Sequence, residues 1–402
     1  VMLTGSNGTP AIGSANITKL DGGAGTDTLS FEESTPATNT TLTLTTANAT
    51  NFENLTGGSN AETLNGDNND NVLRGKGGAD TLNGNGGNDT LDSNSSDSTN
   101  DKLYGGAGDD TLIGNSGDNI LDGGTGADTI TSGSGSDTIV IRSGDGGVSQ
   151  SDGDTVSDFT DGTDSIGLDS IGFDALTITE ISNNAVIKEG GIFLMTLTGV
   201  AASNITVLDF QSSSTSDETY NGTASNDILI GGSGGDTFNG GAGSDTLLGW
   251  GGNDTFNIRS KSGAYADVVN GGAGTDTLNI SYTGVSDLGD FTISVDGTHD
   301  EYDNSAYNII LTDSAGGTIT FTSIETLIVG NYTYSVVQED KSASPDDMQA
   351  YWSAAEQALY VFGESYLSSD VWENGNADIL TGLTINMDVS VTGSPAAEGL
   401  NL

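Results

Sequence analysis

Acidic residues recur along this chain directly after glycine-rich turns, in a nine-residue unit with the pattern Gly-Gly-x-Gly-x-Asp-x-Leu-x. Its clearest copies are GKGGADTLN and GNGGNDTLD, which together run from Gly75 to Asp92. Glycine adopts backbone angles that other residues avoid, so the turn can point its carbonyl oxygens inward. The aspartate adds an anionic oxygen beside them. Hard oxygen donors in a flexible loop are the ligands that calcium prefers, so the unit predicts a Ca²⁺ site.

The units follow one another in two blocks. In the first block they begin at Gly57, Gly66, Gly75 and Gly84, and after three extra residues (Ser93 to Ser95) again at Ser96, Gly105, Gly114, Gly123 and Ser132. In the second block they begin at Gly222, Gly231, Gly240 and Gly249. An insertion between units is expected to form a loop without disturbing the stack.

Two isolated units indicate a larger duplication. GGAGTDTL occurs from Gly22 and again from Gly271. Each copy is followed by a strand-like stretch and then by a short apolar–Glu–x–Leu segment, Phe52–Leu55 in the first case and Ile324–Leu327 in the second. The repetition suggests that one module occurs twice.

The eighth position of the unit predicts how the chain builds a core. In the first block it is aliphatic in every unit: Leu64, Leu73, Leu82, Leu91, Leu103, Leu112, Leu121, Ile130 and Ile139. In the second block it is partly aromatic: Leu229, Phe238, Leu247 and Phe256. If nine residues make half a turn, units n and n+2 lie one above the other. Neighbouring coils then complete the burial that one unit alone cannot achieve.

Composition excludes several classes of protein. Asp and Glu number 57 against 9 Lys and Arg, a formal charge of −48, and such a chain should repel nucleic acid. Bound cations would cancel part of this charge, and without them self-repulsion should keep the repeats open. The chain has no cysteine, so it has no disulfide. It also has no apolar run long enough for a transmembrane segment and no visible signal peptide.

The remaining segments predict the domain organisation of an all-β protein. Residues 1–56 form an N-terminal β segment, 57–140 a first stack, 141–215 an antiparallel β unit that caps it, 216–280 a second stack, and 281–340 a β-rich segment. Residues 341–402 hold a short helix from Pro345 to Phe362 and a tail, as a contact element or secretion signal. Ser344 is its expected N-cap, and Met348, Trp352 and Leu359 fall at helical spacing.

Candidates for catalysis are weak, and we expect no enzyme activity. The only histidine, His299, lies in the acidic sequence THDEYD. Ser365 lies in Gly-Glu-Ser-Tyr-Leu, which departs from a nucleophile elbow at its last position and has no evident triad histidine.

The tandem units resemble the RTX, or haemolysin-type calcium-binding, repeats of bacterial secreted proteins, over roughly residues 57–140 and 222–279. The resemblance implies two parallel β-rolls that bind several Ca²⁺ ions between stacked loops. The metal-site residues it implies are Asp80, Asp89, Asp101, Asp110, Asp128, Asp137, Asp227, Asp236, Asp245, Asp254, Asp276 and Asp27, with Gly75, Gly84, Gly105, Gly123, Gly231 and Gly240. Position six departs from Asp at Glu62, Asn71 and Asn119, which weakens or changes those sites; Asp70 and Asp118 stand one residue earlier.

The sequence therefore favours a non-catalytic, calcium-binding extracellular structural protein of the surface-layer, adhesin or matrix type. Calcium, self-association and a cell-surface glycan are its expected partners, and secretion to the cell surface its expected location. The alternative is the C-terminal part of an enzyme or toxin exported by type I secretion, whose catalytic domain lies outside this chain. An ice- or glycan-binding module would instead need a regular exposed Thr face.

Overall fold

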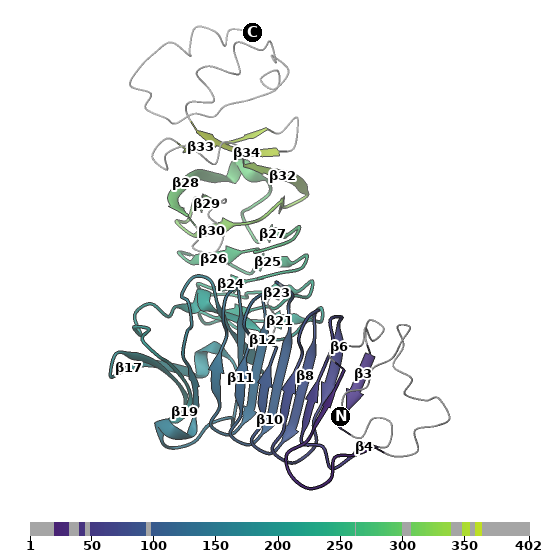
Figure 1. The fold of residues 1–402 in the computed structure, drawn as a ribbon. Helices are drawn as coiled ribbons and strands as arrows, with labels where there is room; N and C mark the ends of the chain where they lie inside the picture. The colour runs from purple at the N-terminus through teal and green to yellow at the C-terminus, as the bar shows by residue number, and fades with distance from the viewer. Residues whose placement is uncertain are drawn as a thin grey trace. The chain divides into compact units, whose positions relative to one another are not determined.

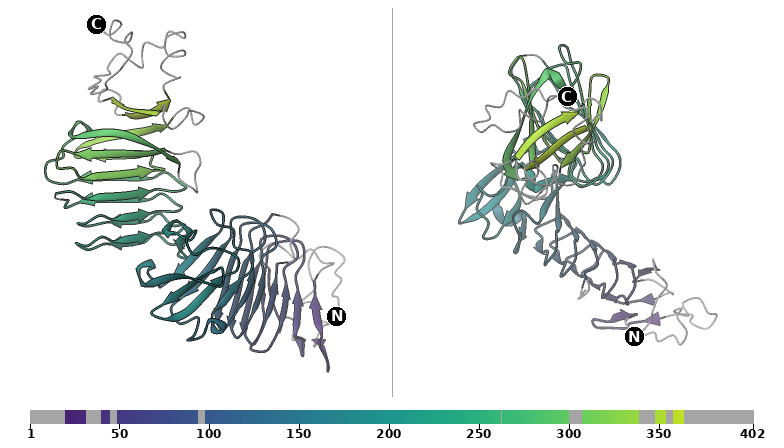
Figure 2. Two further views of the ribbon diagram at one scale, coloured as in Figure 1. Left: turned by 90° about the vertical axis from the view of Figure 1, so that its left-hand side faces the viewer. Right: turned by 90° about the horizontal axis from the view of Figure 1, so that it is seen from above.

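A computed structural model describes residues 20–31, 40–44, 49–93, 98–261, 263–299, 307–338, 348–353 and 358–363 as strands, turns and short 3₁₀ segments (Figure 1). The chain divides into two compact units, Val1–Asp217 with Ile230–Gly234, and Glu218–Leu229 with Gly235–Leu402. Within each unit the strands stack as successive coils (Figure 2). The prediction of an all-β fold of stacked parallel sheets is confirmed.

The first unit contains two long sheets. In strand order, one consists of β20 (Phe210–Ser212), β16 (Ser165–Asp169), β14 (Thr138–Arg142), β12 (Ile120–Thr125), β10 (Lys102–Ala107), β8 (Thr81–Gly86), β6 (Glu62–Asn65) and β3 (Thr40–Thr43). The other consists of β17 (Leu176–Ile181), β18 (Asn184–Glu189), β19 (Ile192–Leu197), β15 (Asp154–Val156), β13 (Thr129–Thr131), β11 (Thr111–Ile113), β9 (Thr90–Asp92), β7 (Val72–Arg74), β5 (Asn54–Thr56) and β2 (Thr28–Ser30). β1 (Leu20–Asp21) pairs with β4 (Ala49–Thr50).

The register confirms that two nine-residue units make one coil. Leu64 of β6 lies beside Leu82 of β8, and Leu73 of β7 lies beside Leu91 of β9, eighteen residues apart in each case. All nine position-eight residues of the first block are 0% exposed. Burial of a leucine side chain contributes about 1.5–3 kcal/mol, so the repeated aliphatic column is the main stabilising feature of the stack.

The three-residue insertion leaves the parallel ladder intact, and residues 94–97 lie outside the described residues. Leu82 pairs with Leu103, 21 residues later, and Leu91 pairs with Leu112 in the same way, so the parallel register is kept. Ser93, however, belongs to the ladder: its N–H donates to Ile113 O, and its carbonyl accepts from Lys76 N–H. Ser93 therefore takes the place of a first-position glycine, which corrects the expectation that the extra residues begin there.

The ladder extends beyond the predicted end of the first block at Val140. β15 and β16 pair in parallel with β13 and β14, and β19 and β20 continue the two sheets. The expected antiparallel pairing is present as well, where β18 pairs with β17 on one side and with β19 on the other. 3₁₀ turns occur at Gln150–Asp152 (η2), Phe173–Ala175 (η3) and Val207–Asp209 (η4).

The second unit repeats this plan. One sheet runs β21 (Thr219–Asn221), β23 (Thr237–Asn239), β25 (Thr255–Arg259), β27 (Thr277–Ser281), β31 (Thr326–Val329), β32 (Tyr332–Gln338), β34 (Ala358–Gly363) and β33 (Met348–Ser353). The other runs β22 (Ile228–Ile230), β24 (Thr246–Leu248), β26 (Ala266–Asn270), β30 (Thr318–Thr322), β29 (Tyr307–Asp313) and β28 (Phe291–His299). A 3₁₀ turn, η5, spans Leu288–Asp290.

Aromatic rings replace leucine in part of the second core. The rings of Phe238 and Phe256 stack with centroids 4.8 Å apart, and Tyr220 stacks on Phe238 at 5.1 Å. Phe238, Leu247 and Phe256 are fully buried, whereas Leu229 is partly buried. Each of these phenylalanines is followed on its strand by an asparagine. The Asn257 side chain donates to Asn239 Oδ1, so a row of asparagines runs parallel to the aromatic column.

The predicted C-terminal helix is wrong. Met348–Ser353 and Ala358–Gly363 are strands, β33 and β34, which pair antiparallel with each other. β34 also pairs in parallel with β32, and Leu359 is buried. A sheet edge offers unpaired N–H and C=O groups that a strand satisfies and a helix does not. This pairing outweighs the helical spacing of the apolar residues. Ser344 and Pro345 lie outside the described residues. None of the described residues belongs to a helix with the length and apolarity needed to cross a bilayer.

Candidate metal centre

The position-six side chains form hydrogen-bonded rows along the edges of each stack, which we call the aspartate rows. The Asp89 N–H donates to Asp110 Oδ1 at 2.6 Å, and the Asp110 N–H donates to Asp128 Oδ1 at 2.7 Å. On the opposite edge, the Asp80 N–H donates to Asp101 Oδ1 at 2.8 Å. Each side chain thus accepts from the coil before it. Parallel pairing spaces these carboxylates at roughly the 4.8 Å of a sheet.

The rows collect the predicted aspartates together with residues that the sequence analysis did not assign. In the first unit they are Glu62–Asp80–Asp101–Asn119–Asp137–Asp164 and Asn71–Asp89–Asp110–Asp128–Asp154. In the second unit they are Glu218–Asp236–Asp254–Asp276 and Asp227–Asp245–Asp267. Asp27 stands apart from these rows, and its N–H donates to Glu53 Oε2 at 2.8 Å.

The second carboxylate oxygen of many row members has no hydrogen-bond partner although it is buried. Among the predicted residues, this holds for Oδ2 of Asp27, Asp89, Asp110, Asp128, Asp137, Asp254 and Asp276. A buried carboxylate oxygen without a partner is costly unless a cation compensates it. The repeated orphan oxygen is therefore the feature of this structure that fits Ca²⁺.

The glycines of the unit leave room for these oxygens. A Cβ on Gly84 would overlap Asp89 Oδ2 and the carbonyl oxygen of Gly105 in the next coil, and a Cβ on Gly105 would overlap Asp110 Oδ2 in the same way. Gly75, Gly123 and Gly240 likewise lie against the Oδ2 of their own unit's aspartate. The carbonyl of Gly231 accepts from the Ser212 N–H at 2.6 Å. At these units the close approach leaves no room for a side chain at position one, whereas Ser132 occupies that position in the unit of Asp137.

Burial makes the metal-free rows electrostatically unfavourable. It raises the pKa of Asp89 to about 6 and the pKa of Asp110 to about 7, against the lowering effect of the backbone N–H that each accepts. Burial likewise raises the pKa of Asp137 and Asp254 to about 7, and Asp276 to about 6. Neighbouring carboxylates add to the increase. The rows accommodate negative charge poorly unless a cation neutralises it.

Backbone carbonyls must provide most of the remaining ligands. In the described part of the chain, no three His, Cys, Asp or Glu side chains converge as a metal site. Asn119 shows where the carbonyls point: its amide nitrogen donates to Gly114 O at 3.2 Å and to Gly117 O at 3.0 Å. In a loop with aspartate at position six, these carbonyls and the orphan Oδ2 would face the same cation. Asn119 instead satisfies them with its own donors.

In three loops a side-chain oxygen at position six accepts a hydrogen bond from a backbone N–H of its own loop. Gly58 N–H donates to Glu62 Oε2, and Asp67 N–H donates to Asn71 Oδ1. Asp227, a predicted ligand, accepts at Oδ2 from the Thr223 N–H at 2.7 Å. Each of these donors is the second residue of its loop. The expected weakening at Asn71 therefore has a structural basis, and it extends to Asp227. Glu62 keeps a buried Oε1 without a partner, so its site is changed and not lost.

The structure adds row members with a signal in the sequence. Asp154, Asp164 and Asp267 each lie at the start of a strand, and the second residue after each is Val or Ile, as in the repeat, but they lack the glycine-rich turn. Glu53 and Glu325 belong to the two apolar–Glu–x–Leu segments. Each accepts from the aspartate of an isolated unit, since the Asp276 N–H donates to Glu325 Oε2 at 2.7 Å just as Asp27 donates to Glu53.

Asp110→Asn is expected to remove about one bound Ca²⁺ while the fold persists. The Asn retains the Oδ1 that accepts from Asp89, but its amide occupies the cation's place as in Asn119. Loss of a site held at 100 times its Kd lowers the free energy of unfolding by about 2.7 kcal/mol. Calcium counting by native mass spectrometry and melting with and without calcium would measure both effects. Asp109→Asn, at the exposed neighbour, is the matched control. Equal ion counts in the two variants would contradict the assignment.

A family model agrees with this geometry. The family model of the RTX calcium-binding nonapeptide repeat, which contains four copies, matches residues 56–94, 95–130, 104–139, 113–146, 218–256 and 261–279. Among solved structures, the chain is similar to the extracellular lipase LipA from Serratia marcescens, at 13% identity and a TM-score of 0.15. The alignment covers 72% of this chain and 41% of the lipase, so the chain spans less than half of the lipase's length. Comparison with curated proteins gave no match.

Most of the orphan carboxylate oxygens lie in loops of the segments that the family model matches. RTX nonapeptide repeats bind Ca²⁺ at multiple sites. The chain therefore contains RTX calcium-binding nonapeptide repeats in these segments of both units.

Proposed function

We propose that this protein is a non-catalytic, calcium-loaded structural protein of the cell exterior, of the surface-layer, adhesin or matrix type. The observation that carries the proposal is the extent of the aspartate rows, which occur in both units and accompany almost every coil of each ladder. A chain in which most described residues build the calcium-dependent scaffold is suited to a scaffold function.

The faces of the ladders support a role in association. In the second unit, Thr219, Thr237, Thr255, Thr277 and Thr326 stand side by side on successive strands. These side chains are exposed or partly exposed. A regular row of hydroxyls on a flat sheet offers repeated hydrogen bonds to a second copy of the chain or to a cell-surface glycan. The formal charge of −48 would be reduced by bound calcium, which would ease the approach of copies.

The second candidate is the C-terminal part of an enzyme or toxin exported by type I secretion. The link between ordering and calcium favours it, because a chain that folds only on meeting calcium would stay open before export. In this case the two ladders would promote export of the protein and its folding outside the cell, and the activity would belong to another part of the protein.

A calcium titration followed by light scattering and circular dichroism tests the proposal. Growth of the folded chain into discrete sheets or filaments, with a parallel gain of β signal, is the expected result. Folding to a monomer that stays monomeric at high calcium and high protein concentration would overturn self-assembly and favour the secretion candidate. A chain whose β signal and size ignore calcium would contradict the metal assignment itself.

A further inference from the structure

A buried lysine lies in the aspartate row of the second unit. Lys261 follows β25, in a coil with four more residues than the usual eighteen, because Thr246 pairs with Val268. Its side chain is 1% exposed. Lysine is almost never fully buried unless its charge is paired, so this position has a specific cause.

The ammonium group is fully coordinated by the loop it enters. Lys261 Nζ donates to Gly243 O at 3.0 Å, to Asp245 Oδ2 at 2.7 Å and to Asp267 Oδ1 at 2.8 Å. These three acceptors match the three donors of an ammonium group. The Tyr265 ring lies 5.3 Å from Nζ, where its face adds a cation–π contact.

In other loops the equivalent carbonyl and carboxylate oxygens are the groups available to bind a cation. Gly243 is the fourth residue of its unit, as Gly117 is in the loop where Asn119 bonds the carbonyl. The Oδ2 of Asp254 is a buried orphan, whereas the Oδ2 of Asp245, at the same position of the preceding unit, is bonded to Lys261. The ammonium therefore stands among oxygens that elsewhere fit Ca²⁺.

We propose that Lys261 is a tethered cation that replaces calcium between the coils of Asp245 and Asp267. This site is closed to Ca²⁺, and the two coils can pair without metal. The inference rests on the proposal that the other loops bind calcium, because only then does Lys261 take the place of an ion. One lysine leaves the two carboxylates with a net charge of −1, so it compensates the pair in part, and Asp267 Oδ2 stays buried without a hydrogen-bond partner.

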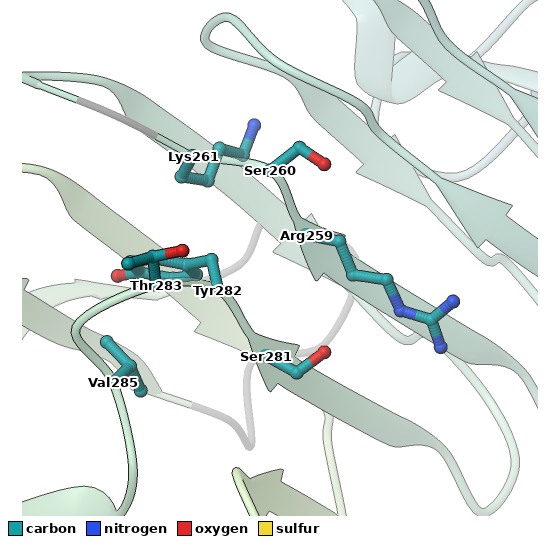
Figure 3. A pocket seen from close by; sticks show the side chains of 7 residues that line it. All are labelled: Arg259, Ser260, Lys261, Ser281, Tyr282, Thr283 and Val285. Atoms are coloured by element: carbon teal, nitrogen blue, oxygen red, sulfur yellow. The ribbon is translucent and has the colours of Figure 1, made fainter.

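The view into the neighbouring groove agrees with this role. The groove is lined by Arg259, Ser260, Lys261, Ser281, Tyr282, Thr283 and Val285. Figure 3 shows the Lys261 ammonium pointing away from Tyr282 and Val285. The charge is thus directed into the coil, where its acceptors lie, and is not offered to a ligand in the groove.

The first unit has a carboxylate and no lysine at the corresponding place. Asp128 and Asp154 pair across β13 and β15 as Asp245 and Asp267 do across β24 and β26. The longer segment that follows β14 carries Asp145, which is buried; its Oδ2 lies 3.6 Å from Arg142 Nη1, and its Oδ1 has no hydrogen-bond partner. One unit therefore inserts a lysine and the other a carboxylate beside equivalent aspartate pairs. The two units are expected to differ in how strongly they depend on calcium.

Lys261→Met tests the replacement directly. The variant removes the charge and keeps most of the volume, so the vacated oxygens should accept one further Ca²⁺, counted by native mass spectrometry. In chelator, β24 and β26 should exchange amide hydrogens at least about tenfold faster than in the parent chain. Lys102→Met, at an exposed lysine, is the control and should change neither quantity. Lys261→Arg keeps the charge and should gain no ion.

The unmodified chain provides a measurement that depends on neither folding of a variant nor assembly. An amine-labelling reagent should modify Lys261 at least about tenfold more slowly than Lys102 in chelator, because only local opening exposes it. Equal labelling rates, or an unchanged ion count in a folded Lys261→Met, would overturn the proposal. Failure of self-assembly would leave both results unaffected.

Discussion

Calcium removal by a chelator at pH 8 is expected to abolish most of the β signal of the chain outside the coils that Lys261 joins, and to expand the chain in solution. The buried Oδ2 atoms of Asp89 and Asp110 in one row, and of Asp137 in the other, then have no cation to compensate them. Because burial already holds their pKa values at about 6 to 7, each carboxylate is ionised at this pH at a cost to the folded state. One pKa unit corresponds to about 1.4 kcal/mol, so several such groups together rival the roughly 5–15 kcal/mol net stability of a domain.

The same carboxylates predict that mild acid replaces calcium in part. A carboxylic acid whose pKa is raised on folding binds more protons folded than unfolded, so stability falls as pH rises through that window. For Asp110 and Asp254 the window runs from their usual value of 3.8 to about 7. In chelator, lowering the pH from 8 to 5 should therefore restore part of the β signal.

Circular dichroism and small-angle scattering at each pH, with and without calcium, measure both expectations. With calcium saturating, the pH dependence should weaken or reverse, because protons then compete with the ion for the same oxygens. A metal-free chain that loses structure on going from pH 8 to pH 5 would contradict the role given to the aspartate rows.

Phe256→Ala is expected to give the largest loss of stability of any single core substitution considered for the second unit. Phe256 is fully buried and stacks on Phe238, and its strand also pairs with β27 at Leu278. Truncation of a buried phenylalanine costs about 3–5 kcal/mol. In a ladder each coil contacts only its neighbours, so the cavity weakens the coupling of coils on both sides.

Thermal melting in saturating calcium should place this transition roughly 10 °C below that of the parent chain. Val268→Ala in β26 is the control, since Val268 is 44% exposed and its loss leaves no cavity. Its effect should stay within about 1 kcal/mol. If the two substitutions shifted melting equally, the aromatic column would not be the core of this unit.

The repeat register was predictable because the same constraint acts on every coil. Leu64, Leu82 and Leu121 have one environment, so their spacing alone reveals the coil and its core. The aspartates at position six are found by the same regularity. The glycines at the first position of most units also helped to identify the repeat. They are explained by the close approach at Gly84 and Gly105, which leaves no room for a side chain.

Residues outside the repeat depend on contacts that local spacing does not encode. Trp352 and Leu359 lie at helical spacing, yet the open edge of β32 organises their segment as strands. Lys261 lies in an irregular stretch, and only the register of β24 with β26 brings it to two aspartates. Asp154 and Asp267 are recognisable by the apolar residue two positions later. Their membership of an aspartate row becomes evident only once the preceding coil is known.

The tolerance of the ladder for coils of unequal length has a consequence for how such chains diversify. Pairing passes unchanged through the 21-residue separation of Leu82 and Leu103 and the 22-residue separation of Thr246 and Val268. Strand pairing in the stack therefore depends on the order of the coils and not on the number of residues in each coil. Length changes are absorbed at the edge loops, so new side chains can be acquired there one coil at a time, at little risk to the core. Variation in such a lineage should concentrate along the rims, as the contrast between Asp145 and Lys261 already illustrates.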